Sequence, residues 1–151
     1  MDLLLTVVNF FHIIFIAWGV GGATIATILM AKGEKEPTIM PVIMKLIGPI
    51  SKLIWVSIIG LIITGIILAV LGYANGDIDK NILMIKQVVV AILILNGLFL
   101  NFKLLPKLKK STPAPASKPS VEFFKFKKYM KISSILSLIL WYAIVLLGVM
   151  L

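Results

Sequence analysis

Long apolar runs with at most one charged residue, separated by short polar segments, make up most of the chain. A helix needs about 20 apolar residues, at about 1.5 Å rise per residue, to cross a hydrocarbon core about 30 Å thick. Runs of this length occupy residues 3–31, 53–74, 82–102 and 132–151. The pattern therefore predicts an all-α, integral membrane four-helix bundle that forms a single transmembrane domain over residues 1–151.

The overall composition supports a multi-pass membrane protein. Hydrophobic residues make up 60% of the chain and the mean hydropathy is +1.11, which is outside the range of soluble domains. The first apolar run follows Asp2 rather than a basic segment, and it is too long for a signal peptide, so we expect a permanent span. The absence of cysteine excludes disulfides and cysteine-held zinc or iron–sulfur clusters within this chain.

The charged residues predict the orientation of the bundle. All 15 basic residues are lysines, and most of them lie in or beside the segment between the third and fourth runs. The link between the second and third runs, NGDIDKN, is poor in lysine. Because lysine resists translocation, we expect both termini and this link outside (N-out/C-out). Residues 103–128, which include the proline-rich stretch KSTPAPASKPS, are predicted to form a flexible basic cytoplasmic linker.

The net charge of +9 follows from this topology and from attraction to anionic lipid headgroups. We therefore expect membrane lipids, and not nucleic acid, to be the partners of the lysine-rich end. The expected location is the plasma membrane.

The single histidine lies inside the first apolar run, within NFFHIIFIAWGVGG (residues 9–22). Polar side chains retained in membrane spans usually face the bundle interior and mark a functional site. Steps of three or four residues place Asn9, His12, Gly19 and Gly22 on one helical face. Taken without the histidine, the glycines of this face are typical of sites where another helix packs closely. Imidazole, however, is the commonest metal ligand, so this face is a candidate cofactor site.

The third run contains a second unusual residue, Lys86. It begins about 6 Å below the outer boundary and His12 about 13 Å below it, so the two side chains are predicted to converge in the outer half of the bundle. Snorkelling of the lysine to the interface is the alternative. Gly97 shares the helical face of Lys86 and would leave room for a flat group. Asn96 and Asn101 lie deeper and are predicted to hydrogen-bond between helices.

These two segments resemble a known superfamily of four-span membrane proteins. The histidine in FFHIIFIAWGVGG and the lysine in ILMIKQVVVAILILNGLFLN are similar to the pattern of the copper resistance D proteins and the HemJ-type protoporphyrinogen oxidases. The resemblance implies haem b binding, with His12 as the axial ligand and Lys86 as the second family residue. Residues 23–37 lack the arginine and aromatic residues that the oxidases carry there, so no particular reaction is implied.

The predicted cofactor-binding residues are His12, Lys86, Asn9, Gly19, Gly22 and Gly97, with His12 and Lys86 as the candidate metal ligands. A protomer supplies a single imidazole, while a bis-histidine haem needs two. The open schemes are a five-coordinate haem, a second ligand from Lys86 or a methionine, and a haem shared between two chains. No catalytic residue is assigned.

We expect a haem b-binding protein with a redox or haem/porphyrin-handling role, which includes a haem-dependent membrane oxidoreductase. We expect it to work as a homo-oligomer with an electron-transfer partner. Two other functions remain open. One is a copper or small-solute carrier, because Met40 and Met44 offer soft thioether ligands for Cu(I). The other is a non-enzymatic accessory membrane subunit whose glycine-rich faces bind partner helices.

Overall fold

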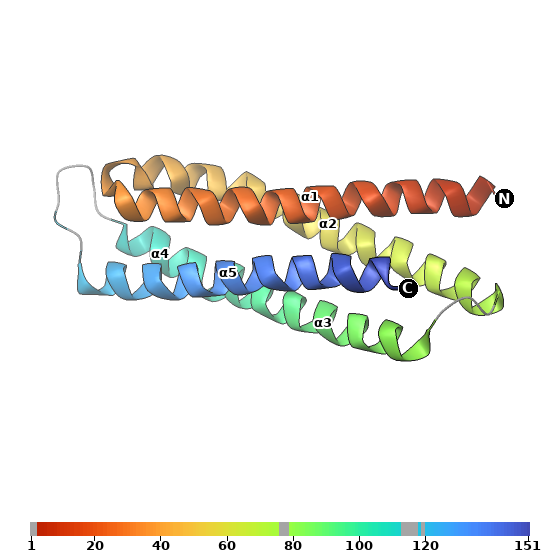
Figure 1. Cartoon of the computed structure of the whole chain (residues 1–151). Helices are drawn as coiled ribbons and strands as arrows, with labels where there is room; N and C mark the ends of the chain where they lie inside the picture. The colour runs from red at the N-terminus through yellow and green to blue at the C-terminus, as the bar shows by residue number, and fades with distance from the viewer. Residues whose placement is uncertain (1–2, 76–78, 113–117, 119) are drawn as a thin grey trace.

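The computed structural model confirms the all-α membrane bundle (Figure 1). It describes residues 3–75, 79–112, 118 and 120–151. Within these ranges it contains no strand, and four helical segments are long and apolar enough to cross a membrane. The helices are α1 (Leu3–Lys35), α2 (Met40–Asn75), α3 (Lys80–Leu98), α4 (Leu105–Ser111) and α5 (Val121–Val149). A 3-10 turn, Pro37–Ile39, precedes α2, and a π-helical segment, Phe99–Leu104, joins α3 to α4.

The long helices run up and down through the bundle. Figure 1 shows that α1 passes into α2 at the same end where α4 and the start of α5 lie, while the N- and C-termini share the opposite end. The start of α3 also lies at the end that carries the termini. This order agrees with four alternating spans. The side of the membrane that each end faces stays a prediction.

The helices continue beyond the predicted apolar spans. In α2 this extension includes the segment from Met40, although prolines occur at positions 37 and 41. A proline in the first turn of a helix removes an N–H group that has no partner there, so it does not interrupt the helix. The length of an apolar run therefore predicts that a membrane helix is present, but it does not predict the residues at which the helix begins and ends.

The linker predicted over residues 103–128 is too long. The helical segments continue to Ser111 and resume at Val121, so only residues 112–120 separate them, and residues 113–117 and 119 lie outside the described part. Pro106 stands in the first turn of α4, directly after the wider π-helical segment, where its missing N–H is tolerated. At the other end Ser120 caps α5, because its hydroxyl accepts a hydrogen bond from the N–H of Phe123 at 3.2 Å.

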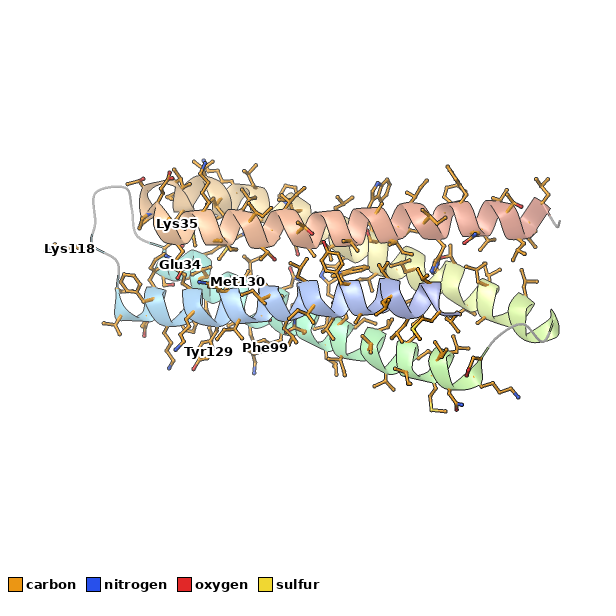
Figure 2. All side chains as sticks on the ribbon, viewed as in Figure 1. Glu34, Lys35, Phe99, Lys118, Tyr129 and Met130 are labelled. Carbon is orange, nitrogen blue, oxygen red and sulfur yellow. The ribbon has the colours of Figure 1, made fainter. Side chains whose placement is uncertain are left out.

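An apolar cluster closes the lysine-rich end of the bundle. It includes four methionines, Met30, Met40, Met44 and Met130, all buried among leucine and isoleucine side chains. Figure 2 shows Met130 of the same cluster on the side of α5 that faces α1, with Glu34 of α1 opposite. Next to the cluster, Lys131 forms an ion pair with Glu34 at 2.7 Å. The methionines therefore act as core side chains, and this observation gives no support to the copper carrier.

Hydrogen bonds between helices confirm the predicted role of the two asparagines. Asn96 of α3 donates to the Ser133 carbonyl at 2.9 Å and to the Ser137 hydroxyl at 2.8 Å, both on α5. The Ser133 hydroxyl returns a bond to the Asn96 side-chain oxygen at 2.6 Å. Asn101 accepts a bond from Ser51 of α2. Such bonds fix helix register in lipid, where polar groups find no water.

Trp141 occupies the centre of the bundle and is 1% exposed. Its ring packs on α1 at Gly19, where a Cβ atom would overlap the ring. A second small residue, Gly22, lies under Ile54 of α2, with 2.8 Å between the Ile54 Cγ1 and the position of an added Cβ. Small residues on α1 therefore admit large side chains from its neighbours, which is the packing that small-residue faces give in membranes.

The orientation can be tested on whole cells, since the chain has no cysteine of its own. We expect Asn81→Cys to react with a membrane-impermeant maleimide and Lys110→Cys to react only after permeabilisation, because lysine-rich segments stay in the cytoplasm. Both positions are exposed. The reverse labelling pattern would show that the bundle is inserted the other way round.

The packing at Trp141 can be tested with two glycines of α1. Gly19→Ala should destabilise the protein by about 1–3 kcal/mol, because the new methyl group displaces the Trp141 ring. Gly21→Ala is the matched control, since no atom lies within 4 Å of its Cβ position, and alanine favours a helix over glycine by about 1 kcal/mol. Thermal unfolding in detergent measures both changes. Equal effects would contradict the packing assignment.

Candidate functional site

His12 is held between α1 and α2 with only 9% of its surface exposed. Its Nδ1 lies 2.7 Å from the hydroxyl oxygen of Thr64, in the middle of α2. The packing of α1 on α2 brings these two residues together, although 52 positions separate them in the chain. The prediction that the histidine faces the bundle interior agrees with this position.

The bonding of Thr64 indicates which nitrogen of His12 carries the proton. The Thr64 hydroxyl has one hydrogen, and the carbonyl oxygen of Gly60, one turn earlier, accepts it at 2.7 Å. The Thr64 oxygen therefore accepts the hydrogen of Nδ1–H, an assignment that follows from the bonding pattern. Nε2 is then the unprotonated nitrogen, and its lone pair is available to a ligand.

A cleft of about 750 Å³ lies beside His12. It forms because α2 and α3, although consecutive, pack mainly on α1 and α5 and hardly on each other. Its walls are mostly aliphatic and come from α2 and α3, with Leu61, Gly65, Ile66, Ala69, Leu83 and Val90 among the lining residues. Cofactor pockets are typically about 300–1,000 Å³ and mostly apolar. The volume and the lining of the cleft both fall in this class.

Nε2 of His12 borders this cleft. The imidazole is one of the lining groups, and within the described ranges no residue forms a hydrogen bond with Nε2. A fully enclosed nitrogen without a partner would be an unsatisfied buried atom, and the described side chains contain none. The lone pair of Nε2 therefore faces open space.

Lys86 of α3 lines the same cleft and is half-buried. Its Nζ reaches α5, where it lies 3.3 Å from the position that a Cβ atom would take at Gly148. His12 and Lys86 therefore reach one cleft from α1 and α3. The expected convergence of His12 and Lys86 in one half of the bundle is therefore present.

Asn9 does not join this site. It is exposed and it does not line the cleft. The buried stripe of α1 at this level passes through Val8 and His12, which are four residues apart, whereas Asn9 lies three residues from His12 and at the edge of the stripe. The structure therefore does not bring the predicted cofactor-binding residue Asn9 into this cleft.

The three predicted glycines also lie outside the cleft. Trp141 occupies the space beside Gly19, and Ile54 occupies the space beside Gly22. A Cβ atom at Gly97 would lie 3.5 Å from the Trp55 ring. Gly97 instead borders a separate inner cavity of about 70 Å³. For these glycines the packing interpretation is the one that the contacts support.

The inner cavity is separate from the cleft and has several polar side chains in a mostly apolar wall. Side chains of Thr27, Ser51, Asn101, Ser134 and Ser137 contribute to its lining, and it has the volume of about two water molecules. Three buried residues line both cavities and so form the wall between them: Ile58, Leu93 and Trp141. The cleft therefore ends at an apolar floor.

Thr64 and Gly65 are the site residues that sequence reasoning missed. Both belong to GLIITGII in the second span, where Thr64 is the single hydroxyl among aliphatic residues. The rule that polar residues in spans mark function would have selected Thr64. Gly65 is recognisable only from the fold, because its Cβ position lies 3.6 Å from Cε1 of His12.

The described residues contain no group of three or more histidine, cysteine, aspartate or glutamate side chains that would hold a bare metal ion. The chain matches no family model, no curated protein and no solved structure. The features of this chain that bear on function are therefore the cleft, His12 and Lys86.

The tautomer of His12 is directly measurable, because the chain has one histidine and gives one pair of ring nitrogen signals. In ¹⁵N NMR of protein without added ligand we expect a protonated Nδ1 and a bare Nε2. Thr64→Val should remove this preference, since valine cannot accept the bond. A wild-type ring protonated mainly at Nε2 would contradict the assignment.

Proposed function

We propose that this chain is a haem b-binding membrane protein with a redox or porphyrin-handling role, in which Nε2 of His12 would hold the haem iron. The single observation that carries the proposal is an imidazole whose Nδ1 is fixed by Thr64 and whose Nε2 borders a large apolar cleft. The resemblance of the histidine and lysine segments to copper resistance D and HemJ-type proteins leads to the same proposal.

The hydrogen bond from His12 to Thr64 is the kind that supports a metal ligand. Ligating histidines almost always donate their other N–H to a nearby acceptor, which fixes the ring and raises its basicity. Thr64 is itself held by its bond to the Gly60 carbonyl, so the acceptor does not rotate away. The ring is therefore oriented before any ligand arrives.

The number of donors favours a prosthetic group over a bare ion. A structural or catalytic ion usually takes three or four protein ligands, whereas haem brings four ring nitrogens and needs one or two more. His12 supplies that one donor. When bound, the haem iron would supply electron-transfer or oxidative chemistry, while this chain supplies the ligand, the orientation and a site with little water.

The remaining parts of the proposal concern location and assembly. Large apolar side chains cover the outer faces of all the long helices, as expected for contact with lipid. We place the protein in the plasma membrane, as a homo-oligomer that exchanges electrons with a partner. An oxidoreductase activity belongs to the same proposal.

The test is an absorption spectrum of detergent-purified protein supplied with haem b, oxidised and reduced. We expect a Soret band that His12→Ala abolishes. Thr64→Val should weaken haem binding about 10- to 100-fold, as loss of a supporting hydrogen bond does at other metal sites.

Asn9→Ala is the matched control on the same helix, since Asn9 does not line the cleft. It should leave the spectrum and the affinity unchanged. A colourless wild-type protein, or a Soret band that persists in His12→Ala, would exclude the proposed ligation.

A further inference from the structure

Lys86 presents a cationic group to an apolar cleft without an anion to balance it. It lines the cleft with His12, and the described part of the chain places no carboxylate within ion-pair distance of it. A charge held near hydrocarbon is unfavourable unless it is paired or reaches water. The cleft therefore has one unmet electrostatic requirement, which is a negative charge beside Nζ of Lys86.

The position of Nζ indicates where that negative charge would lie. Nζ is next to Gly148, one residue before α5 ends. Lys86 is about 9 Å along α3 from its start at Lys80, at the end of the bundle that carries the termini. The negative charge would therefore lie between the first turns of α3 and the last turn of α5.

Nζ of Lys86 lies beside the last turn of α5. The last carbonyl groups of a helix carry partial negative charge, which attracts a cation. A protonated amine has no lone pair and cannot ligate iron, but it donates strong hydrogen bonds to a carboxylate. A protonated Lys86 side chain is thus suited to bind an anion and not a metal.

The cleft is open between α2 and α3. Ile66, Val70 and Met84 line it and are also more than half exposed, so its rim belongs to the outer apolar surface of the bundle. A ligand that dissolves in the membrane is able to enter here without crossing water. Its body must be apolar to match the aliphatic walls, and its charged group must lie beside Nζ of Lys86.

We propose that Lys86 binds a carboxylate of the ligand through its ammonium group, while the apolar body of that ligand lies in the cleft against His12. The ligand class is a membrane-soluble, flat carboxylic acid. Its identification as a porphyrin rests on the haem proposal above. In this arrangement Lys86 is a binding residue for the carboxylate, and His12 is the iron ligand from this site.

Metal-free protoporphyrin IX and its dimethyl ester test this role without iron. We expect purified wild-type protein to bind the free acid at least about tenfold more tightly than the ester, the effect of one charged hydrogen bond. Lys86→Met should lower the affinity for the acid to that for the ester, and Lys86→Arg should keep the preference. Lys103→Met, an exposed lysine outside the cleft, is the matched control and should bind like wild type. Porphyrin fluorescence measures all four proteins.

Two results would overturn the proposal. One is equal binding of acid and ester by the wild type, including no binding of either. The other is a Lys86→Met variant that keeps the preference for the acid. If anionic phospholipid vesicles, and not the porphyrin acid, show the Lys86-dependent binding, the anion is a lipid phosphate and the carboxylate assignment is wrong.

The iron-loaded protein separates this proposal from the function proposed above. Lys86→Met should leave the wavelength of the Soret band unchanged, and a shifted band would make Lys86 an iron ligand and overturn the carboxylate role. Preference for the acid without a His12-dependent Soret band would keep the carboxylate site and remove the haem proposal. A Soret band that depends on His12, without any preference for the porphyrin acid over its ester, would keep the haem proposal and remove the carboxylate site.

Discussion

His12 donates its Nδ1 hydrogen to Thr64, and this bond joins α1 to α2 beside the cleft. A polar ring in lipid must find a partner inside the protein, and Thr64 is the partner that the packing of α1 on α2 supplies. Because the Thr64 hydroxyl hydrogen is used by Gly60, the direction of the bond is fixed. The free lone pair at Nε2, and with it the proposed ligand chemistry, depends on this arrangement.

The cleft depends in turn on how the other helices pack. Trp141 fills the middle of the bundle against Gly19, and Asn96 fixes α3 to α5 through the two serines. With α3 held on α5 and α2 held on α1, the space between α2 and α3 remains open at the level of His12. The contacts of Trp141 and Asn96 are therefore tight, while the space between α2 and α3 beside His12 stays open.

Charge is distributed unevenly along the same bundle. At the lysine-rich end, Lys131 is paired with Glu34 and lies next to the methionine-containing cluster. At the opposite end, Lys86 has no carboxylate partner among the residues described. Surface lysines are explained by topology and lipid headgroups, but a half-buried lysine in an apolar cleft needs an additional explanation, which the carboxylate of a ligand provides.

The sequence by itself determined the number of spans, the helical class and the inward position of His12, because lipid requires about 20 apolar residues per span and penalises an unpaired polar ring. Asn96 and Asn101 were predictable as interhelical hydrogen-bonding residues for the same reason. Only the tertiary structure decided that Thr64 is the partner of His12, that Asn9 lies outside the site and that Gly19 and Gly22 serve packing. These roles depend on which helical faces meet, and neither apolar length nor spacing within one helix contains that information.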